Sequence, residues 1–401
     1  MLYEDTPGWD QGRWTNSDRL PGDASEDACH VLDAAFTARL LLEWDAISGG
    51  DKPAVEYVQR FADRLCKLQR PSGAFPGWFE PDGRVVPTLA EGPETAMGAT
   101  LLLELLGRDA NRADYRKTAK AALDYLEKGP VADSRWEDFE TYFSCNRWGA
   151  RDHIGRKVAR NGVYKQNTFS PFWCAEAFLA ASQVLGEKRY LDLGRRCLDE
   201  LSLFQQVWDP PFVAARCHGG FGVMNADGEW NDARQSLFAP LYLDYYRATG
   251  EAEYFERGVS ALRASFAMLY CPENSQVRKQ YELQHPFFGP ESFGFMMENV
   301  AHGGPAPADG SAIGPFTIYT WGNGAAMAAA AKVRDRYGDI YVDAPRRQAF
   351  GIDGCTATLQ GARVTVTDRF KRPALIAVHG DGQRETVTLT DGHGELSLKA
   401  Q

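Results

Sequence analysis

The chain has 401 residues, of which 44% are hydrophobic and 24% are charged, and its formal net charge at pH 7 is −10. This composition is ordinary for a folded globular protein, and the length suits one large domain or two smaller ones. The acidic balance argues against a nucleic-acid partner, because nucleic-acid-binding proteins usually carry a basic face. No apolar run approaches the roughly 20 residues that a membrane span needs, so no membrane association is expected.

The first residues, MLYEDTPGWDQGRW, do not have the basic start and apolar core of a secretory signal. This indicates a cytoplasmic protein, or a secreted or periplasmic one whose leader is missing from the sequence.

Five segments of helix length are apolar over much of their circumference, which predicts helices that are buried on most sides. In chain order they are residues 29–44, 94–106, 171–185, 232–249 and 321–338. Each of the first four is followed by a Gly-containing turn and a more charged helical segment. The glycine suits a helix C-cap, where a positive φ is needed. Each charged segment carries an early tyrosine, which we interpret as a packing residue between helices: Tyr57, Tyr115, Tyr190 and Tyr254.

Inner and outer helices that alternate in this way predict an all-α toroid, an (α/α)6-barrel of helical hairpins, over residues 1–340. A sixth hairpin would come from the irregular stretch 271–316 or be completed by the N-terminus. From about Tyr341 the pattern changes to alternating apolar and polar residues with Gly-Asp and Asp-Gly turns. Residues 341–401 are therefore predicted to form a small antiparallel β appendage.

In a toroid the inner helices all run the same way, so their N-termini meet at one end, where unpaired N–H groups favour anionic and polar ligands. Polar and aromatic residues are concentrated just before the predicted inner helices and in two long connections. The candidates for catalysis are Asp232, Glu94, Glu298 and His218. The candidates for substrate binding are Tyr142, Arg147, Asn167, Trp173, Trp230, Arg234, His302 and Trp321. Tryptophan rings suit the apolar face of a sugar, while Asn and Arg read its hydroxyls.

Each candidate also has a structural interpretation. Asp232 could cap a helix, and Glu94 could serve the helix dipole in a first turn. Asp33, inside an apolar segment, is either a salt-bridge partner or a site residue, because an unpaired buried acid is costly. His30 and His153 are more typical of ordinary polar residues than of catalysts.

The sequence implies no metal and no cofactor. Its eight cysteines are scattered without a C-x-x-C pair, which is typical of free thiols used as small hydrophobes. The segment NADGEWND lacks the length and the final glutamate of a calcium loop. Nucleotide-binding glycine motifs and the G-x-S-x-G elbow of serine hydrolases are also absent from the sequence.

Over most of residues 25–340 the chain resembles the six-hairpin glycosidase superfamily. The more particular segments are GVYKQNTFSPFWCAEAF, GGFGVMNADGEWNDARQS and FGFMMENVAHGG…GPFTIYTWGNGAA. They are similar to a bacterial group of β-glucuronidase-type enzymes, glycoside hydrolase family 154. This resemblance implies a glycan substrate that contains a uronic acid, whose carboxylate Arg147, Lys165 or Arg234 would bind.

Several mechanisms remain open at this point. A glycoside hydrolase needs two carboxyl groups, for which Asp232 with Glu94 or Glu298 are the candidates, assisted by His218 and His302. A polysaccharide lyase would instead use a Tyr or His base with neutralising polar groups, and Tyr142, Asn146, Arg147, Asn167 and His218 fit that need. A sugar epimerase and a non-enzymatic sugar-binding toroid are further alternatives.

Overall fold

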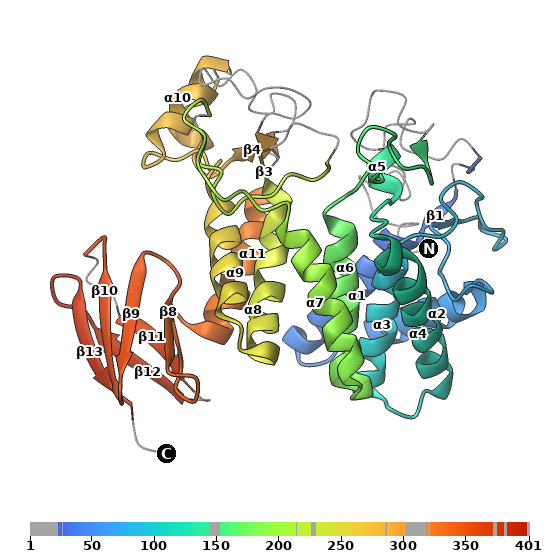
Figure 1. Ribbon diagram of the computed structural model, residues 1–401, viewed down its shortest axis with the longest axis horizontal. Helices are drawn as coiled ribbons and strands as arrows, with labels where there is room; N and C mark the ends of the chain where they lie inside the picture. Colours follow the sequence, from blue (N-terminus) through green and yellow to red (C-terminus); the bar gives the residue numbers. More distant parts are fainter. Residues whose placement is uncertain are drawn as a thin grey trace. The chain divides into compact units, whose positions relative to one another are not determined.

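The structure is a computed structural model, and two compact units divide the chain (Figure 1). Unit 1 comprises Met1–Phe204 and Val223–Asp227, and unit 2 comprises Gln205–Gly222 and Gly228–Gln401. The structure describes residues 23–25, 27–143, 153–213, 215–225, 230–284, 287–297, 299–300, 318–319, 321–371, 375–380 and 383–398.

Unit 1 consists mainly of three consecutive helical hairpins, which lie side by side in Figure 1. In each hairpin the first helix is the more apolar one, and α3 is buried along nearly all of its length. The hairpins are α1 (Val31–Ser48) with α2 (Lys52–Leu68), α3 (Thr95–Arg108) with α4 (Ala113–Leu126), and α6 (Phe169–Leu185) with α7 (Lys188–Ser202). A π-helical turn (Glu127–Val131) and the short helix α5 (Phe139–Phe143) connect the second hairpin to the third.

Glycine ends the first helix of two of these hairpins. Gly49 and Gly186 follow α1 and α6 with φ values of 79° and 74°, the left-handed conformation that an L side chain rarely adopts. The corresponding expectation for Gly107 was wrong, because α3 continues through it to Arg108 and ends at Asp109. Asp51 caps α2 by accepting a hydrogen bond from the N–H of Ala54 at 3.1 Å.

A buried arginine holds the three first helices of unit 1 together. Arg39 on α1 is only 15% exposed and donates through both Nη atoms to Glu176 on α6, each at 2.7 Å. Its Nε donates to Glu104 on α3 at 2.9 Å. Burial alone would lower the pKa of Arg39, but the two carboxylates outweigh it and raise this pKa. One guanidinium therefore fixes the spacing of α1, α3 and α6.

The first helix α1 departs from the expectation of burial on most sides. One face packs on α2 and α3, yet four large apolar side chains remain exposed. They are Phe36, Leu40, Trp44 and Ile47.

Unit 2 contains the fourth hairpin, α8 (Phe238–Thr249) with α9 (Ala252–Ala264), and the helices α10 (Ser275–Gln284) and α11 (Trp321–Tyr337). The predicted start of the fourth inner helix differs, because Ala233–Leu237 forms a 3-10 turn before α8 begins. Strand β3 (Asn231–Asp232) directly precedes this turn and pairs antiparallel with β5 (Asn299–Val300). A second pair joins β4 (Met296–Met297) to β6 (Ile318–Tyr319).

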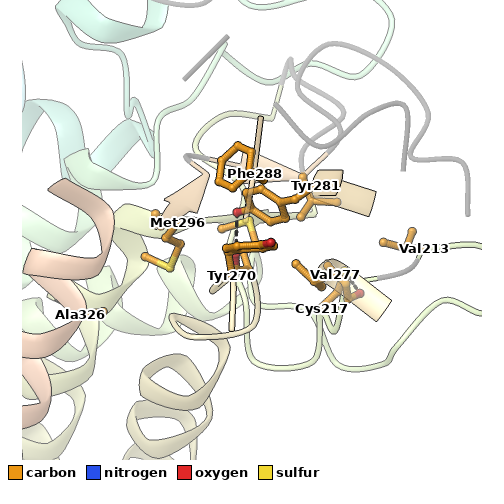
Figure 2. Close-up of a cluster of buried hydrophobic side chains, with 12 residues drawn as sticks. Val213, Cys217, Tyr270, Val277, Tyr281, Phe288, Met296 and Ala326 are labelled. Carbon is orange, nitrogen blue, oxygen red and sulfur yellow. Dashed lines mark hydrogen bonds between the residues drawn. The ribbon is translucent and has the colours of Figure 1, made fainter. Parts of the chain in front are cut away.

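A hydrophobic cluster lies under these strand pairs (Figure 2). Tyr270, Tyr281 and Phe288 pack ring against ring, with centroids 4.9 to 5.3 Å apart. Val213 and Cys217 join the cluster from a loop that lies more than fifty residues earlier in the chain. The loop containing residues 205–222 is thus fixed to the core of unit 2 through its apolar side chains.

The C-terminal part of unit 2 is antiparallel β structure. Strand β10 (Arg363–Asp368) pairs with β9 (Cys355–Gln360) and β13 (His393–Ser397). Two further pairs are β7 (Ile340–Asp343) with β8 (Gln348–Gly351) and β11 (Leu375–Gly380) with β12 (Gln383–Thr388). Val364, Val366, Val378 and Val387 are among the buried side chains of their common core.

The fold class is as predicted: all-α hairpins of the (α/α) kind in series, followed by a small C-terminal antiparallel β appendage. Within the stretch 271–316, where a sixth hairpin was considered, the described residues form α10, a 3-10 turn at Pro290–Ser292 and the short strands β4 and β5. Of the helices that the structure describes, none has the length and apolar character to cross a membrane.

Candidate functional site

The site in unit 1 is built around a buried histidine at the start of α1. Strand β1 (Cys29–His30) pairs with β2 (Trp78–Phe79), which sets His30 opposite Trp78. The imidazole stacks on the Trp78 ring with centroids 4.5 Å apart and planes 16° from parallel. The ring of Phe139 closes a third side, 5.2 Å from His30 and 5.1 Å from Trp78. His30 is 6% exposed and Trp78 is 1% exposed.

Two carboxylates face the two ring nitrogens of His30. Nδ1 lies 2.9 Å from Oδ2 of Asp33, one turn further along α1, and Nε2 lies 3.7 Å from Oε1 of Glu94. Burial alone would lower the pKa of His30, but these carboxylates outweigh it and raise the pKa to about 10. The two carboxylates therefore favour the protonated, imidazolium form of His30.

Glu94 occupies the position just before α3, yet it does not cap that helix. Its side chain makes no capping hydrogen bond, and Oε1 instead accepts the N–H of Phe139 at 2.9 Å. The other oxygen faces Gly77, where a Cβ would lie 3.3 Å from Oε2. Glu94 is only 5% exposed. Glu94 is therefore a buried carboxylate at the start of α3 that contacts His30 and the backbone of Phe139 instead of capping the helix with its side chain.

The extended segment 136–139 joins the site to α6. The carboxylate of Asp138 accepts the N–H and hydroxyl of Thr141 through Oδ1, at 2.9 and 2.7 Å, and the hydroxyl of Ser170 through Oδ2, at 2.8 Å. The N–H of Asn167 donates to the carbonyl of Trp136 at 2.9 Å. The starts of α1, α3 and α6 therefore all contact the segment 136–139. Within this segment, the N–H of Phe139 donates to Glu94.

Tyr142 is part of a separate buried network. Its hydroxyl donates to Oε1 of Glu137, which also accepts the N–H of Gly155 at 3.0 Å, while Arg135 pairs with Oε2. Tyr142 is 1% exposed, and burial together with the Glu137 carboxylate raises its pKa. A phenol in this state does not suit the role of a catalytic base, since it donates to a carboxylate and resists ionisation.

Among the described residues around the starts of α1, α3 and α6, several buried polar atoms have no hydrogen-bond partner. They are Nε2 of His30, Nε1 of Trp78 and Nδ2 of Asn167. The 3.7 Å from His30 to Glu94 is too long for a hydrogen bond. A buried donor without a partner costs about 1–3 kcal/mol, so such atoms point to a ligand that satisfies them.

Further predicted residues belong to unit 2 and form hydrogen-bonded turns there. Asp232 in β3 is 2% exposed and lies opposite Asn299, whose Oδ1 is buried without a partner. The neighbouring Asn231 accepts from Gln235 and donates through Nδ2 to the carbonyl of Ala264 at 3.2 Å. Asp232 is not the cap of α8, because the 3-10 turn intervenes and Leu237 precedes that helix.

Three other predicted residues differ in their surroundings. His218 is exposed in a loop of unit 2, and its N–H donates to Asp209 at 2.9 Å. Trp230 is half-buried and contacts Trp208 and Phe212. Trp173 is buried on α6 in unit 1, where it stacks on Phe169, which favours a packing role.

The remaining candidates lie outside what the structure describes. Arg147, Glu298 and His302 are outside the described residues, as are the side chains of Arg234 and Trp321. Among the described residues no group of three or more His, Cys, Asp or Glu is arranged to hold a metal ion.

The sequence interpretation undervalued several residues of this site. His30 was treated as an ordinary polar residue and Asp33 as undecided, and Trp78, Glu137 and Asp138 were not among the candidates. Adjacent acids between the aromatic residues Trp136 and Phe139 were an available signal, since acids in such a segment are stable only when paired.

Comparison by sequence and comparison by structure give different results, since matches are found among solved structures only. No protein-family model matches the chain, and no curated protein sequence matches it. Among solved structures, a D-mannose isomerase is 14% identical, with 77% of this chain and 73% of that chain covered and a TM-score of 0.47. An unsaturated glucuronyl hydrolase from Bacillus sp. GL1 is 16% identical, with 76% and 74% covered and a TM-score of 0.46. A family 76 α-mannanase from Bacteroides thetaiotaomicron is 10% identical, with 76% and 71% covered and a TM-score of 0.42. At these identities and TM-scores the similarity assigns no activity to this chain.

Proposed function

We propose that this chain is a carbohydrate-active enzyme, a glycoside hydrolase that acts on a glycan containing uronic acid, and that Glu94 is a catalytic carboxylate. The observation that carries the proposal is the surroundings of Glu94. The carboxylate is 5% exposed and lies 3.7 Å from Nε2 of His30, whose ring packs against Trp78 and Phe139, at a helix start that Glu94 does not cap.

The chemistry follows from these contacts. In glycoside hydrolysis a carboxylate either activates water or attacks the sugar directly, while a second group protonates the leaving oxygen. Glu94 has the burial and fixed orientation for the carboxylate role, because the N–H of Phe139 holds one of its oxygens. The unpartnered Nε2–H of His30 is a charged donor that can bind a substrate oxygen next to Glu94.

The aromatic side chains suit a sugar. Trp78 and Phe139 supply apolar surface, while Nε1 of Trp78 and Nδ2 of Asn167 are donors that sugar oxygens would satisfy. The uronic acid in the proposal rests on the sequence resemblance, and the arginines expected to bind its carboxylate are Arg147 and Arg234. Tyr142 does not suit the role of the base in the lyase alternative, because its hydroxyl donates a hydrogen bond to Glu137.

The test compares the wild-type chain with Glu94→Gln on a panel of glucuronic- and galacturonic-acid oligosaccharides. New reducing ends report hydrolysis, and ultraviolet absorbance of a new double bond reports elimination. We expect reducing ends without absorbance from the wild type, and a loss of roughly 100-fold or more in Glu94→Gln.

The matched control is Glu91→Gln, three residues earlier, where a partly exposed glutamate pairs with Arg70. This variant should keep wild-type turnover. Full turnover by Glu94→Gln would refute the assignment of Glu94, and rising absorbance would replace the hydrolase with a lyase. Cleavage of neutral glycans alone would remove the uronic acid from the proposal.

A further inference from the structure

Unit 2 carries a group of aromatic rings at its surface, which we call the aromatic corner: Trp208, Phe212 and Trp230. The ring centroids are 5.8 to 6.3 Å apart, and each pair of ring planes meets at 70° to 79°. Trp208 and Phe212 are each 49% exposed, and Trp230 is half-buried. Rings of this size exposed together are unusual on a protein surface without a ligand or partner.

A rigid turn presents the first two rings. Pro210 and Pro211 lie between Trp208 and Phe212 and restrict the backbone there. Asp209 ties the turn to the returning chain, since its Oδ1 accepts the N–H groups of Cys217 at 2.8 Å and His218 at 2.9 Å. The geometry of the corner is therefore set before any ligand arrives, which lowers the entropic cost of binding.

The third ring is anchored to the core. The N–H of Trp230 donates to the carbonyl of Val300 at 3.1 Å, which extends the pairing of β3 with β5. The ring packs against the cluster shown in Figure 2, which also takes Val213 and Cys217 from the loop that bears the other two rings. The same core thus contacts Trp230 directly and holds the loop of Trp208 and Phe212 through Val213 and Cys217.

The polar neighbours of the corner alternate with buried residues. In the segment 215–218, Ala215 and Cys217 are buried, whereas Arg216 and His218 are exposed. The side chains of Arg216 and His218 therefore point away from the core. They lie in the loop segment whose backbone is hydrogen-bonded to Asp209. Hydrogen-bonding groups beside aromatic faces are the combination that sugar hydroxyls and ring carbons require.

We infer that the aromatic corner is a sugar-binding site of unit 2 that holds one residue of a glycan by stacking. This inference rests on the function proposed above. Three nearly perpendicular ring planes do not offer the flat or grooved surface that a helix or strand of a protein partner needs. The rings pack edge to face on one another, and Trp208 and Phe212 keep exposed apolar surface that suits the apolar face of a sugar.

The experiment measures binding of uronic-acid oligosaccharides of increasing length by calorimetry. The Glu94→Gln chain serves as the parent, so that the ligand is not cleaved. Adding Trp208→Ala or Phe212→Ala should weaken the binding of oligosaccharides to the aromatic corner by about 10-fold, the loss typical of one stacked aromatic anchor. Adding Trp208→Tyr should restore most of the affinity, because the aromatic plane is kept.

Phe370→Ala is the control, since Phe370 is 55% exposed in the β appendage of the same unit. It should leave binding unchanged, and urea unfolding should show that all variants are folded. Unchanged affinity in both corner variants would overturn the sugar-binding site while leaving the proposed function intact. Absence of any glycan binding or cleavage by the wild type would instead refute the proposed function. A change of the wild-type oligomeric state in the corner variants would identify a protein interface and also overturn the sugar-binding site.

Discussion

Replacing Arg39 by alanine should destabilise unit 1 more than the loss of any surface arginine. Removing one partner of a buried ion pair costs about 3–5 kcal/mol, because the remaining charge is left uncompensated. Here the carboxylates of Glu104 and Glu176 keep 35% and 26% of their side-chain exposure, so water can partly replace the guanidinium. We therefore expect a loss of about 2–4 kcal/mol in the free energy of unfolding.

The assay is urea unfolding, followed by far-ultraviolet circular dichroism. Arg39→Lys keeps the charge but not the two-pronged contact with Glu176, and should recover only part of the loss. Arg189→Ala is the matched control, since Arg189 also contacts several carboxylates in unit 1 but is 44% exposed. Its expected cost is below about 1 kcal/mol.

A double-mutant cycle isolates the contact itself. Combined with Glu176→Gln, the Arg39→Ala substitution should cost less than the sum of the two single changes, with a coupling of about 1–3 kcal/mol. Equal losses in Arg39→Ala and Arg189→Ala, with no coupling in the cycle, would refute the view that Arg39 holds α1, α3 and α6 together.

Three further predictions concern titration, the segment 136–139 and the thiols. The folded-state pKa of His30, about 10, lies above its unfolded value near 6.5, so its contribution to stability is complete below pH 6.5 and is lost as the pH rises toward 10. Unfolding titrations should show this fall in the wild type and a flatter profile in His30→Gln; identical profiles would contradict the imidazolium assignment. Asp138→Asn should lower the free energy of unfolding by about 1–3 kcal/mol, because it replaces the carboxylate that accepts hydrogen bonds from Thr141 and Ser170. The control is Asp133→Asn at an exposed position, which should not change this free energy measurably. Cys174 is buried, and burial raises its pKa, so iodoacetamide should label this thiol only after unfolding. The partly exposed Cys271 should react in the folded chain. Labelling of both cysteines at equal rates would show that Cys174 is not buried.

The helices were predictable because their signals are local. Apolar segments such as 94–106 and 171–185 carry enough buried surface to identify α3 and α6, and the left-handed glycines Gly49 and Gly186 mark where helices stop. Gly107 shows the limit of that rule. A glycine is tolerated inside a helix when the following residues continue it, and no local pattern distinguishes the two cases.

The site was predictable only in part. The rule that inner-helix starts carry function selected Glu94 and Asn167, and the structure brings both to the end of unit 1 where α1, α3 and α6 begin. The rule could not select His30, because its state depends on Glu94, 64 residues away in the chain. The same holds for Asp138, whose partner Ser170 lies 32 residues later.

Other expectations from the sequence stay predictions. They include the closure of the hairpins into a ring, the division of the chain at residue 340, and catalytic roles for Asp232, Glu298 and His218. Ring closure and a common active site depend on contacts between segments far apart in the chain, which composition and periodicity do not specify.

The most direct measurement is a crystal structure of Glu94→Gln with a bound uronic-acid oligosaccharide. The amide keeps the shape of the side chain while preventing the carboxylate chemistry, so the ligand should remain intact. We predict a glycosidic oxygen or sugar hydroxyl within hydrogen-bond distance of residue 94, and Nε2 of His30 donating to the same sugar. An oligosaccharide bound elsewhere, with His30 and Trp78 still unpartnered, would contradict the assignment of the active site to the start of α3.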